Sequence, residues 1–253
     1  MKDLIMNKNP VDVLDILYTI LDVKPQPDYE IENLRNWLAN NYVPLSRYRH
    51  IFHELGIAER VVENYPWDLT VAYFNAADTG PGWLNGFDKE FPELSKYLYE
   101  AFGLPLEEVG VIIFLPMREK HKGLGFWHND IDIAGLRLFF EIDDVTKNKL
   151  LMRRMKEPYD KRPNIQLPMN EEAYLQKEVF ECKILSDKQC HFLNNIRGAH
   201  ATYTEELGTN RIAAFVTGKL NNQQKFFDLV KPLILRSAEL YKEHVIMWEP
   251  ESK

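Results

Sequence analysis

The sequence predicts an α+β protein in which a mainly helical first part, residues 1–105, precedes a set of short strands. Two observations lead to this fold class. Apolar residues recur at helical spacing before Pro105, and short apolar or alternating segments separated by turn residues follow it. An amphipathic stretch within residues 220–253 then predicts a C-terminal helix. No linker-like segment separates these parts, so we expect one domain over residues 1–253.

Four segments of the first part place apolar residues on one helix face. They are residues 11–21, 29–40, 45–55 and 91–102. The stretch from Ala76 to Gly86 contains glycines and a proline and predicts a loop. Gly103 and Pro105 close the last of these helices.

The second part, residues 106–219, has the period of β structure. Val109 to Leu115 is a continuous apolar run, and Leu136 to Ile142 alternates between apolar and other residues. Further short strands are expected over 179–185, 189–193, 199–204 and 211–217. This number and spacing of strands is typical of a sandwich or barrel. A polar, basic segment over residues 145–177 interrupts the strands and predicts an insertion.

Composition and charge exclude several classes of function. The net charge is −7, which disfavours non-specific nucleic-acid binding because that binding depends on Lys and Arg. No apolar run has the roughly 20 residues that a membrane helix needs, and the N-terminus lacks a secretory signal. The only cysteines, Cys182 and Cys190, are therefore expected to be reduced, in a cytoplasmic protein without membrane or nucleic-acid partners.

Three residues have the chemistry of a metal site. His128 and Asp130 are two apart, so on one strand their side chains point to the same side. His200, on a later strand, supplies a second imidazole. Two histidines and one carboxylate on one face of a metal form the facial triad of non-haem Fe(II) oxygenases. Arg211 begins a further strand, and a buried arginine there needs an anion such as a carboxylate.

This pattern resembles the Fe(II)/2-oxoglutarate-dependent dioxygenases, over roughly residues 109–219. The resemblance implies a double-stranded β-helix, a jelly-roll or cupin-like barrel with the N-terminal helices packed outside. It further implies that His128, Asp130 and His200 bind Fe(II), and that Arg211 binds the distal carboxylate of 2-oxoglutarate. Many members carry Ser two residues after the Arg, where this chain has Ala213. Asp130 is present, which favours hydroxylation over halogenation.

The implied reaction uses O2, decarboxylates 2-oxoglutarate to succinate and oxidises an unactivated C–H bond. The expected substrate is a small polar metabolite, such as a free or carrier-linked amino acid. Two alternatives stay open: a hydroxylase of protein or peptide side chains, and a non-catalytic jelly-roll binding module. The substrate, the oxidised carbon and the oligomeric state do not follow from the sequence.

Other residues are weaker candidates. The loop around Trp83 and the basic insertion are candidate lids, and Trp127 either lines the pocket or packs in the barrel. Arg137 is a candidate for binding an acidic group, although its alternation with an apolar face favours a solvent-side position. His50 and His53 are three apart on an expected helix without an evident third ligand, so a surface position is favoured.

Overall fold

A computed structural model of the protein describes ten stretches of the chain. They are residues 12–41, 70–76, 80–118, 122–124, 127, 134–142, 145–157, 174–208, 210–219 and 223–250. The fold is mixed α+β, with antiparallel sheets and few helices in these stretches. In the described residues no helix is long and apolar enough to cross a membrane.

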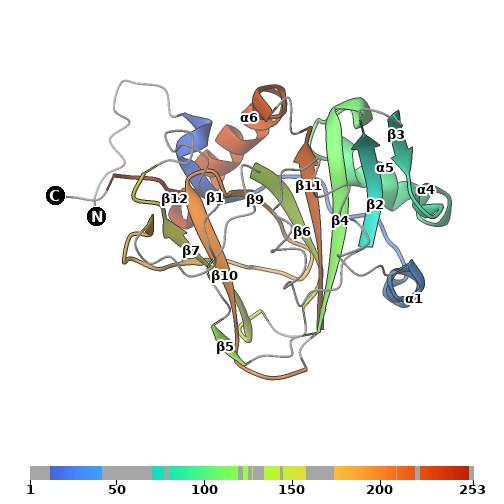
Figure 1. Ribbon diagram of the computed structural model, residues 1–253, viewed down its shortest axis with the longest axis horizontal. Coiled ribbons are helices and arrows are strands. Elements are labelled where there is room, and N and C mark those ends of the chain that lie inside the picture. Colours follow the sequence, from blue (N-terminus) through green and yellow to red (C-terminus); the bar gives the residue numbers. More distant parts are fainter. Residues whose placement is uncertain are drawn as a thin grey trace.

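The larger sheet has eight strands, in the order β12-β1-β9-β6-β11-β4-β2-β3, and its paired strands are antiparallel. Their bounds are β1 Ile16–Ile20, β2 Thr70–Ala76, β3 Gly80–Trp83, β4 Val109–Arg118, β6 Ala134–Ile142, β9 Cys190–Asn194, β11 Asn210–Gly218 and β12 Ile246–Met247. In Figure 1 these strands follow one another across the molecule in this order.

The smaller sheet has four antiparallel strands in the order β5-β10-β7-β8. They are β5 Gly123–Leu124, β7 Asn148–Arg154, β8 Phe180–Cys182 and β10 Gly198–Thr204. Along the chain, strands β4 to β11 alternate between the two sheets, except that β7 and β8 are consecutive in the smaller one. Segments distant in sequence are thereby brought together inside the fold.

Two apolar layers hold the sheets and helices in place. Leu150 and Met152 of β7 share a buried cluster with Leu193 of β9 and Ala213 of β11, so this layer lies between the sheets. On its other face the larger sheet buries a second cluster, which includes Phe114 and Phe192 from strands and residues of α1, α5 and α6. Burial of these apolar side chains is the main stabilising contribution.

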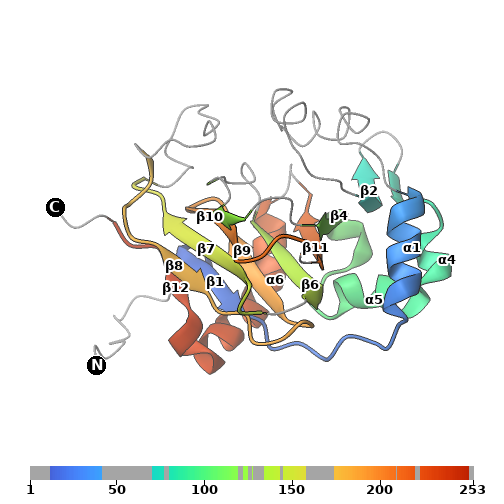
Figure 2. The same cartoon turned by 90° about the horizontal axis from the view of Figure 1, so that it is seen from below.

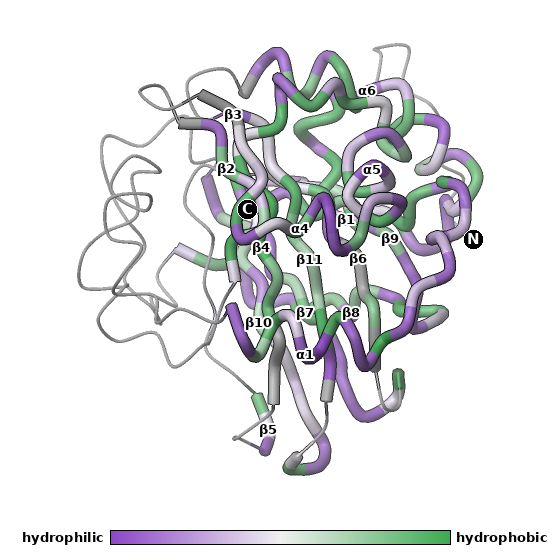
Figure 3. Tube along the Cα trace, turned by 90° about the vertical axis from the view of Figure 1, so that its right-hand side faces the viewer, coloured by the Kyte–Doolittle hydropathy of each residue, from purple (hydrophilic) through white to green (hydrophobic). Residues whose placement is uncertain are grey.

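The described α-helices pack on the outer face of the larger sheet. Their bounds are α1 Ile31–Asn41, α4 Phe87–Glu90, α5 Pro92–Glu100 and α6 Gln223–Leu240. Figure 2 shows α1, α4 and α5 together at the β2 and β4 end of the sheet. In Figure 3 α6 alternates between hydrophilic and hydrophobic segments, as expected of a helix with one buried face.

The structure confirms several expected elements and corrects three. The helix expected over residues 11–21 is wrong: β1 occupies Ile16–Ile20, and all five of its residues are buried. A strand buried on both faces has no alternation, so its apolar spacing imitates a helix. The loop expected over 76–86 contains β3, which pairs with β2. The helix expected over 45–55 and both histidines on it, His50 and His53, lie outside the described residues.

The third correction concerns the basic segment 145–177. Its first part forms β7, which pairs with β10 along its whole length. Lys149 and Leu151 occupy the partly exposed positions between buried Asn148, Leu150 and Met152. Arg153 and Arg154 follow, and the basic residues conceal the period-two pattern. Residues 158–173 of this segment lie outside the described part of the chain.

Both cysteines are free and buried, in different layers. Cys182 belongs to the cluster between the sheets, and Cys190 to the cluster beneath the helices. Burial raises the pKa of the Cys190 thiol to about 12, and it also raises the pKa of Cys182. A thiol with this pKa has little thiolate at neutral pH and is a poor nucleophile.

We therefore expect an aromatic disulfide reagent at pH 8 to label Cys190 in the folded protein about a thousandfold more slowly than in denaturant. Both thiols should react after unfolding, which provides the internal control. Rapid labelling of two thiols without denaturant would contradict the buried positions.

Candidate functional site

His200 lies in the middle of β10, with its side chain directed into the space between the sheets. Its register partner is Met152 of β7, which belongs to the cluster between the sheets. Its neighbours Ala199 and Ala201 pack in a separate cluster on the outer face of the smaller sheet. The alternation of the strand therefore buries the imidazole, which is 2% exposed.

Two contacts determine the tautomer of His200. Its Nδ1 lies 3.0 Å from Asn195 Oδ1, and its Nε2 lies 3.4 Å from an Nη2 of Arg137. A guanidinium can only donate, so Nε2 must be the acceptor and Nδ1 must carry the proton. A neutral imidazole whose second nitrogen is held by an oxygen acceptor is the usual form of a metal-binding histidine. His200 is thus held in a state that can bind a metal through Nε2.

Arg211 lies at the start of β11 and is 3% exposed. It shares a strand face with Ala213, which packs between the sheets, whereas Ile212 and Ala214 face the helices. The expected inward position of Arg211 is therefore observed. A guanidinium there can donate two parallel hydrogen bonds to a carboxylate.

Arg137 of β6 also points into this space, and the solvent-side position favoured from its sequence is wrong. The residue is 5% exposed, and its register partners are His191 of β9 and Phe215 of β11. Its guanidinium carbon lies 5.5 Å from the centroid of the Phe215 ring. Both faces of β6 are buried because the larger sheet is the middle layer of the fold, between the helices and the smaller sheet.

His191 completes the polar lining of this space. It is fully buried, and its ring centroid lies 5.2 Å from that of Tyr18. Burial lowers the pKa of His191 well below its usual value, and the charges of Arg137 and Arg211 lower it further. The imidazole is therefore neutral at physiological pH, and both guanidinium charges lie close enough to influence it.

This neutral histidine makes the stability of the protein depend on pH. Below about pH 6.5 the unfolded chain protonates His191 but the folded protein does not, so the free energy of unfolding decreases as pH falls. Between pH 7.5 and 5.5 we expect this group to contribute a loss of about 1.4 kcal/mol. Urea unfolding at the two pH values should show this loss in the natural protein and not in His191→Gln. An equal pH dependence in both proteins would contradict the buried neutral state, and between pH 7.5 and 8.5 the two should not differ in slope.

His128 and Asp130 lie outside the described residues, so their predicted roles remain predictions. Within the described stretches no group of three His, Cys, Asp or Glu side chains is placed to hold a metal. The other two predicted residues, Arg211 and His200, both line the space between the sheets.

Both tryptophan candidates pack elsewhere. Trp127 lies on the outer face of the smaller sheet with Met155, Leu175, Ala199 and Ala201, and the guanidinium of Arg153 lies over its ring at 5.4 Å. Trp83 belongs to β3 and stacks on Phe87, with ring centroids 5.6 Å apart, in the layer beneath the helices. Trp83 thus has a packing role, on the face of the larger sheet opposite to the space that contains His200.

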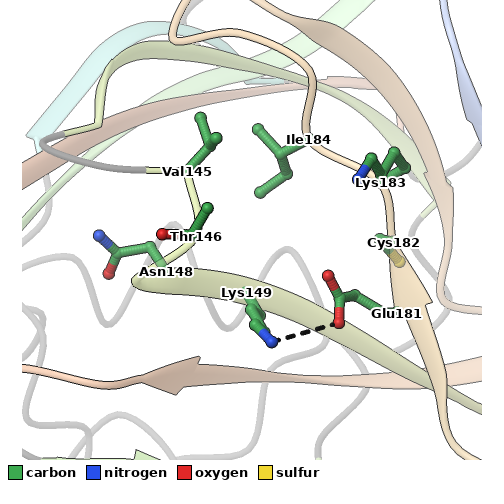
Figure 4. A pocket seen from close by; sticks show the side chains of 8 residues that line it. All are labelled: Val145, Thr146, Asn148, Lys149, Glu181, Cys182, Lys183 and Ile184. Carbon is green, nitrogen blue, oxygen red and sulfur yellow. Dashed lines mark ion pairs between the residues drawn. The ribbon is translucent and has the colours of Figure 1, made fainter.

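A pocket of about 130 Å³ opens between the turn before β7 and strand β8. Figure 4 shows its lining, in which Lys149 and Glu181 form an ion pair of 3.5 Å across the two strands. Neither of the two predicted site residues that the structure describes, His200 and Arg211, lines it. We assign the candidate site to the polar space around His200 and not to this pocket.

Sequence reasoning missed two residues of the site, Asn195 and His191. Asn195 follows the end of β9 and reaches the imidazole of His200 five residues later. The adjacent Asn194 and Asn195 are both fully buried, which is unusual for asparagine. The sequence signal for His191 is its place in an expected strand beside Cys190 and the apolar Phe192 and Leu193. The structure shows that this strand is buried throughout, where a polar side chain needs a polar neighbour.

Neither a protein-family model nor a curated protein matches the chain. Among solved structures, it is similar to EvdMO1, with a TM-score of 0.37 and 11% identity, over 81% of this chain and 48% of that one. The epimerase SnoN, solved with Fe3+, alpha ketoglutarate and nogalamycin RO, matches with a TM-score of 0.31 and 11% identity, over 75% of this chain and 85% of SnoN. The Fe(II)/(alpha)ketoglutarate-dependent dioxygenase TqaL matches with a TM-score of 0.32 and 10% identity, over 75% and 87%. The chain spans about half the length of EvdMO1, and at these TM-scores its function has to be inferred from its own residues.

Proposed function

We propose that the protein is an Fe(II)- and 2-oxoglutarate-dependent oxygenase that hydroxylates a small polar metabolite, such as a free or carrier-linked amino acid. The observation that carries the proposal is the state of His200. Its imidazole is buried between two sheets, and Asn195 holds Nδ1, so that Nε2 is the nitrogen with a lone pair. His128 and Asp130 are the proposed second and third ligands.

The strand order supports a double-stranded β-helix as the scaffold. Strands β4, β6, β9 and β11 lie side by side in one sheet, and β5, β7, β8 and β10 form the other. A chain that alternates between two antiparallel sheets in this way is typical of a jelly roll. Its interior is lined by side chains from both sheets, which is where ligands converge in this proposal.

The charge of the interior fits a dicarboxylate. Arg211 and Arg137 are both buried on the inner face of the larger sheet. Arg211 lies on β11, and Arg137 lies on the adjacent strand β6, opposite Phe215 of β11. A carboxylate placed between the sheets would gain a charge-assisted, bidentate hydrogen bond from a guanidinium. We propose that Arg211 binds and orients the distal carboxylate of 2-oxoglutarate.

Iron bound at this site would supply the oxidation chemistry, and the protein's residues would bind, orient and shield the reactants. His200 and its partner Asn195 fix the direction of one metal ligand. The apolar cluster between the sheets, with Leu150, Leu193 and Ala213, excludes water from the neighbouring space. Hydroxylation consumes one O2 and one 2-oxoglutarate and releases CO2 and succinate for each oxidised C–H bond.

The proposal is tested by measuring succinate release with Fe(II), 2-oxoglutarate, ascorbate and a panel of amino acids and related metabolites. We expect one class of metabolite to stimulate succinate formation and to gain 16 mass units. Arg211→Ala should raise the KM for 2-oxoglutarate at least about tenfold, because a buried charged hydrogen bond is lost. Failure of Fe(II) or 2-oxoglutarate to bind at all would overturn the proposal in favour of a non-catalytic jelly-roll module.

A further inference from the structure

The guanidinium of Arg137 occupies the direction from which a metal ion would approach His200. Its Nη2 lies 3.4 Å from Nε2, and both side chains are at least nine-tenths buried. Nε2 is an sp² nitrogen with a single lone pair in the plane of the ring. That lone pair accepts either the hydrogen of Arg137 or a bond to a metal ion, and it cannot do both.

We propose that Arg137 competes with the metal ion for Nε2 of His200, so that the arginine has to withdraw before the site is loaded. This inference rests on the proposed function, since it concerns the same metal ligand. Arg137 is here a positioning residue: it keeps the buried imidazole in the Nδ1-protonated tautomer while no cation is bound to it. It also places a positive charge where a cation would sit, which disfavours non-productive occupancy.

Arg137 also has a contact that does not involve Nε2 of His200. Phe215 is its register partner on β11, and the guanidinium carbon already lies 5.5 Å from the centroid of that ring. A contact with an aromatic face stabilises a guanidinium and does not use the lone pair of Nε2, so it can persist when Arg137 releases that nitrogen. On the other side its register partner is His191, which is neutral and therefore does not repel it.

The test is the binding of Co(II) alone, without 2-oxoglutarate, followed by the visible absorption of the bound metal. Arg137→Met removes the donor and retains a long buried side chain, and Arg137→Gln serves as a second variant if the first does not fold. Loss of the competing hydrogen bond should tighten the dissociation constant of Co(II) about tenfold. Arg154→Met is the matched control, because Arg154 stacks on Phe180 and bonds Met247 O, away from His200. It should leave the dissociation constant unchanged.

Binding kinetics separate competition from simple charge repulsion. If Arg137 must leave first, the observed rate of Co(II) binding to the natural protein reaches a plateau as the concentration of Co(II) rises. In Arg137→Met the rate should rise linearly over the same range. Equal affinities, or tighter binding with linear kinetics in both proteins, would overturn the competition. Absence of Co(II) binding to every variant would instead overturn the proposed function.

Discussion

Replacing His200 with alanine is expected to lower the affinity of the protein for Fe(II) by at least about 100-fold and to reduce 2-oxoglutarate turnover to background. The substitution removes a ligand whose imidazole is buried and whose tautomer is held by Asn195. Of the other described histidines, His191 belongs to β9 of the larger sheet and His244 to the short 3-10 turn Lys242–His244, so neither occupies the position of His200 on β10. Metal titration of the purified variant and succinate release are the two measurements.

A substitution of Asn195, which contacts His200, is expected to weaken metal binding less than the loss of His200 itself. Asn195→Ala leaves the imidazole in place but removes the acceptor at Nδ1, so metal affinity should fall about 10- to 100-fold. His244→Ala, which removes a half-buried histidine from a short 3-10 turn, is the control for loss of an imidazole elsewhere. If His200→Ala and His244→Ala bound Fe(II) equally well, the metal assignment would be wrong.

Replacing Gly110 with alanine is expected to destabilise the fold by about 3 kcal/mol. A Cβ at this position of β4 would lie 2.3 Å from the carbonyl oxygen of Gly218 on the adjacent strand β11. The obstacle is backbone, which cannot move aside without breaking the pairing of the two central strands. The register of this pair already shifts between Thr217 and Gly218, where the backbones approach.

Gly82→Ala is the matched control for this prediction. Gly82 lies on the edge strand β3, and a Cβ there would meet nothing within 4 Å. Since alanine also restricts the unfolded chain, this variant should be unchanged or stabilised by about 0.5 kcal/mol. Urea unfolding followed by circular dichroism measures both. Equal stabilities of the two variants would show that β4 and β11 do not approach as closely as described.

Local periodicity was sufficient to predict the helices that have one buried and one exposed face. The structure confirms a helix at α1, where Leu34, Trp37 and Leu38 are buried, and one at α5, with Leu94 and Leu98. It also confirms strands at β4, β10 and β11. Periodicity failed at β1, where the apolar residues of a strand buried on both faces also fit helical spacing. It failed again at β7, where Lys149, Arg153 and Arg154 conceal the alternation.

The site shows the same division. The pattern of a His-x-Asp pair, a distal His and an Arg, together with the family that it resembles, singled out His200 and Arg211. Their strands direct both into the space between the sheets. Arg137 was assigned to the solvent side because its strand has an apolar face formed by Leu136 and Phe140. Sequence does not reveal that a second sheet covers the opposite face, and for this reason Arg137 and His191 were not recognised as part of the interior.

By itself the sequence determined the class of elements, the series of short strands in the second half and two polar residues of the interior. These follow from local properties, such as side-chain alternation and turn formation, which depend only on residues that are close together in the sequence. Only the tertiary structure decided which faces are covered, that Asn195 holds the imidazole of His200, and that Arg137 contacts its other nitrogen. These contacts join different strands of two sheets, and their free energy exists only once the layers have packed together.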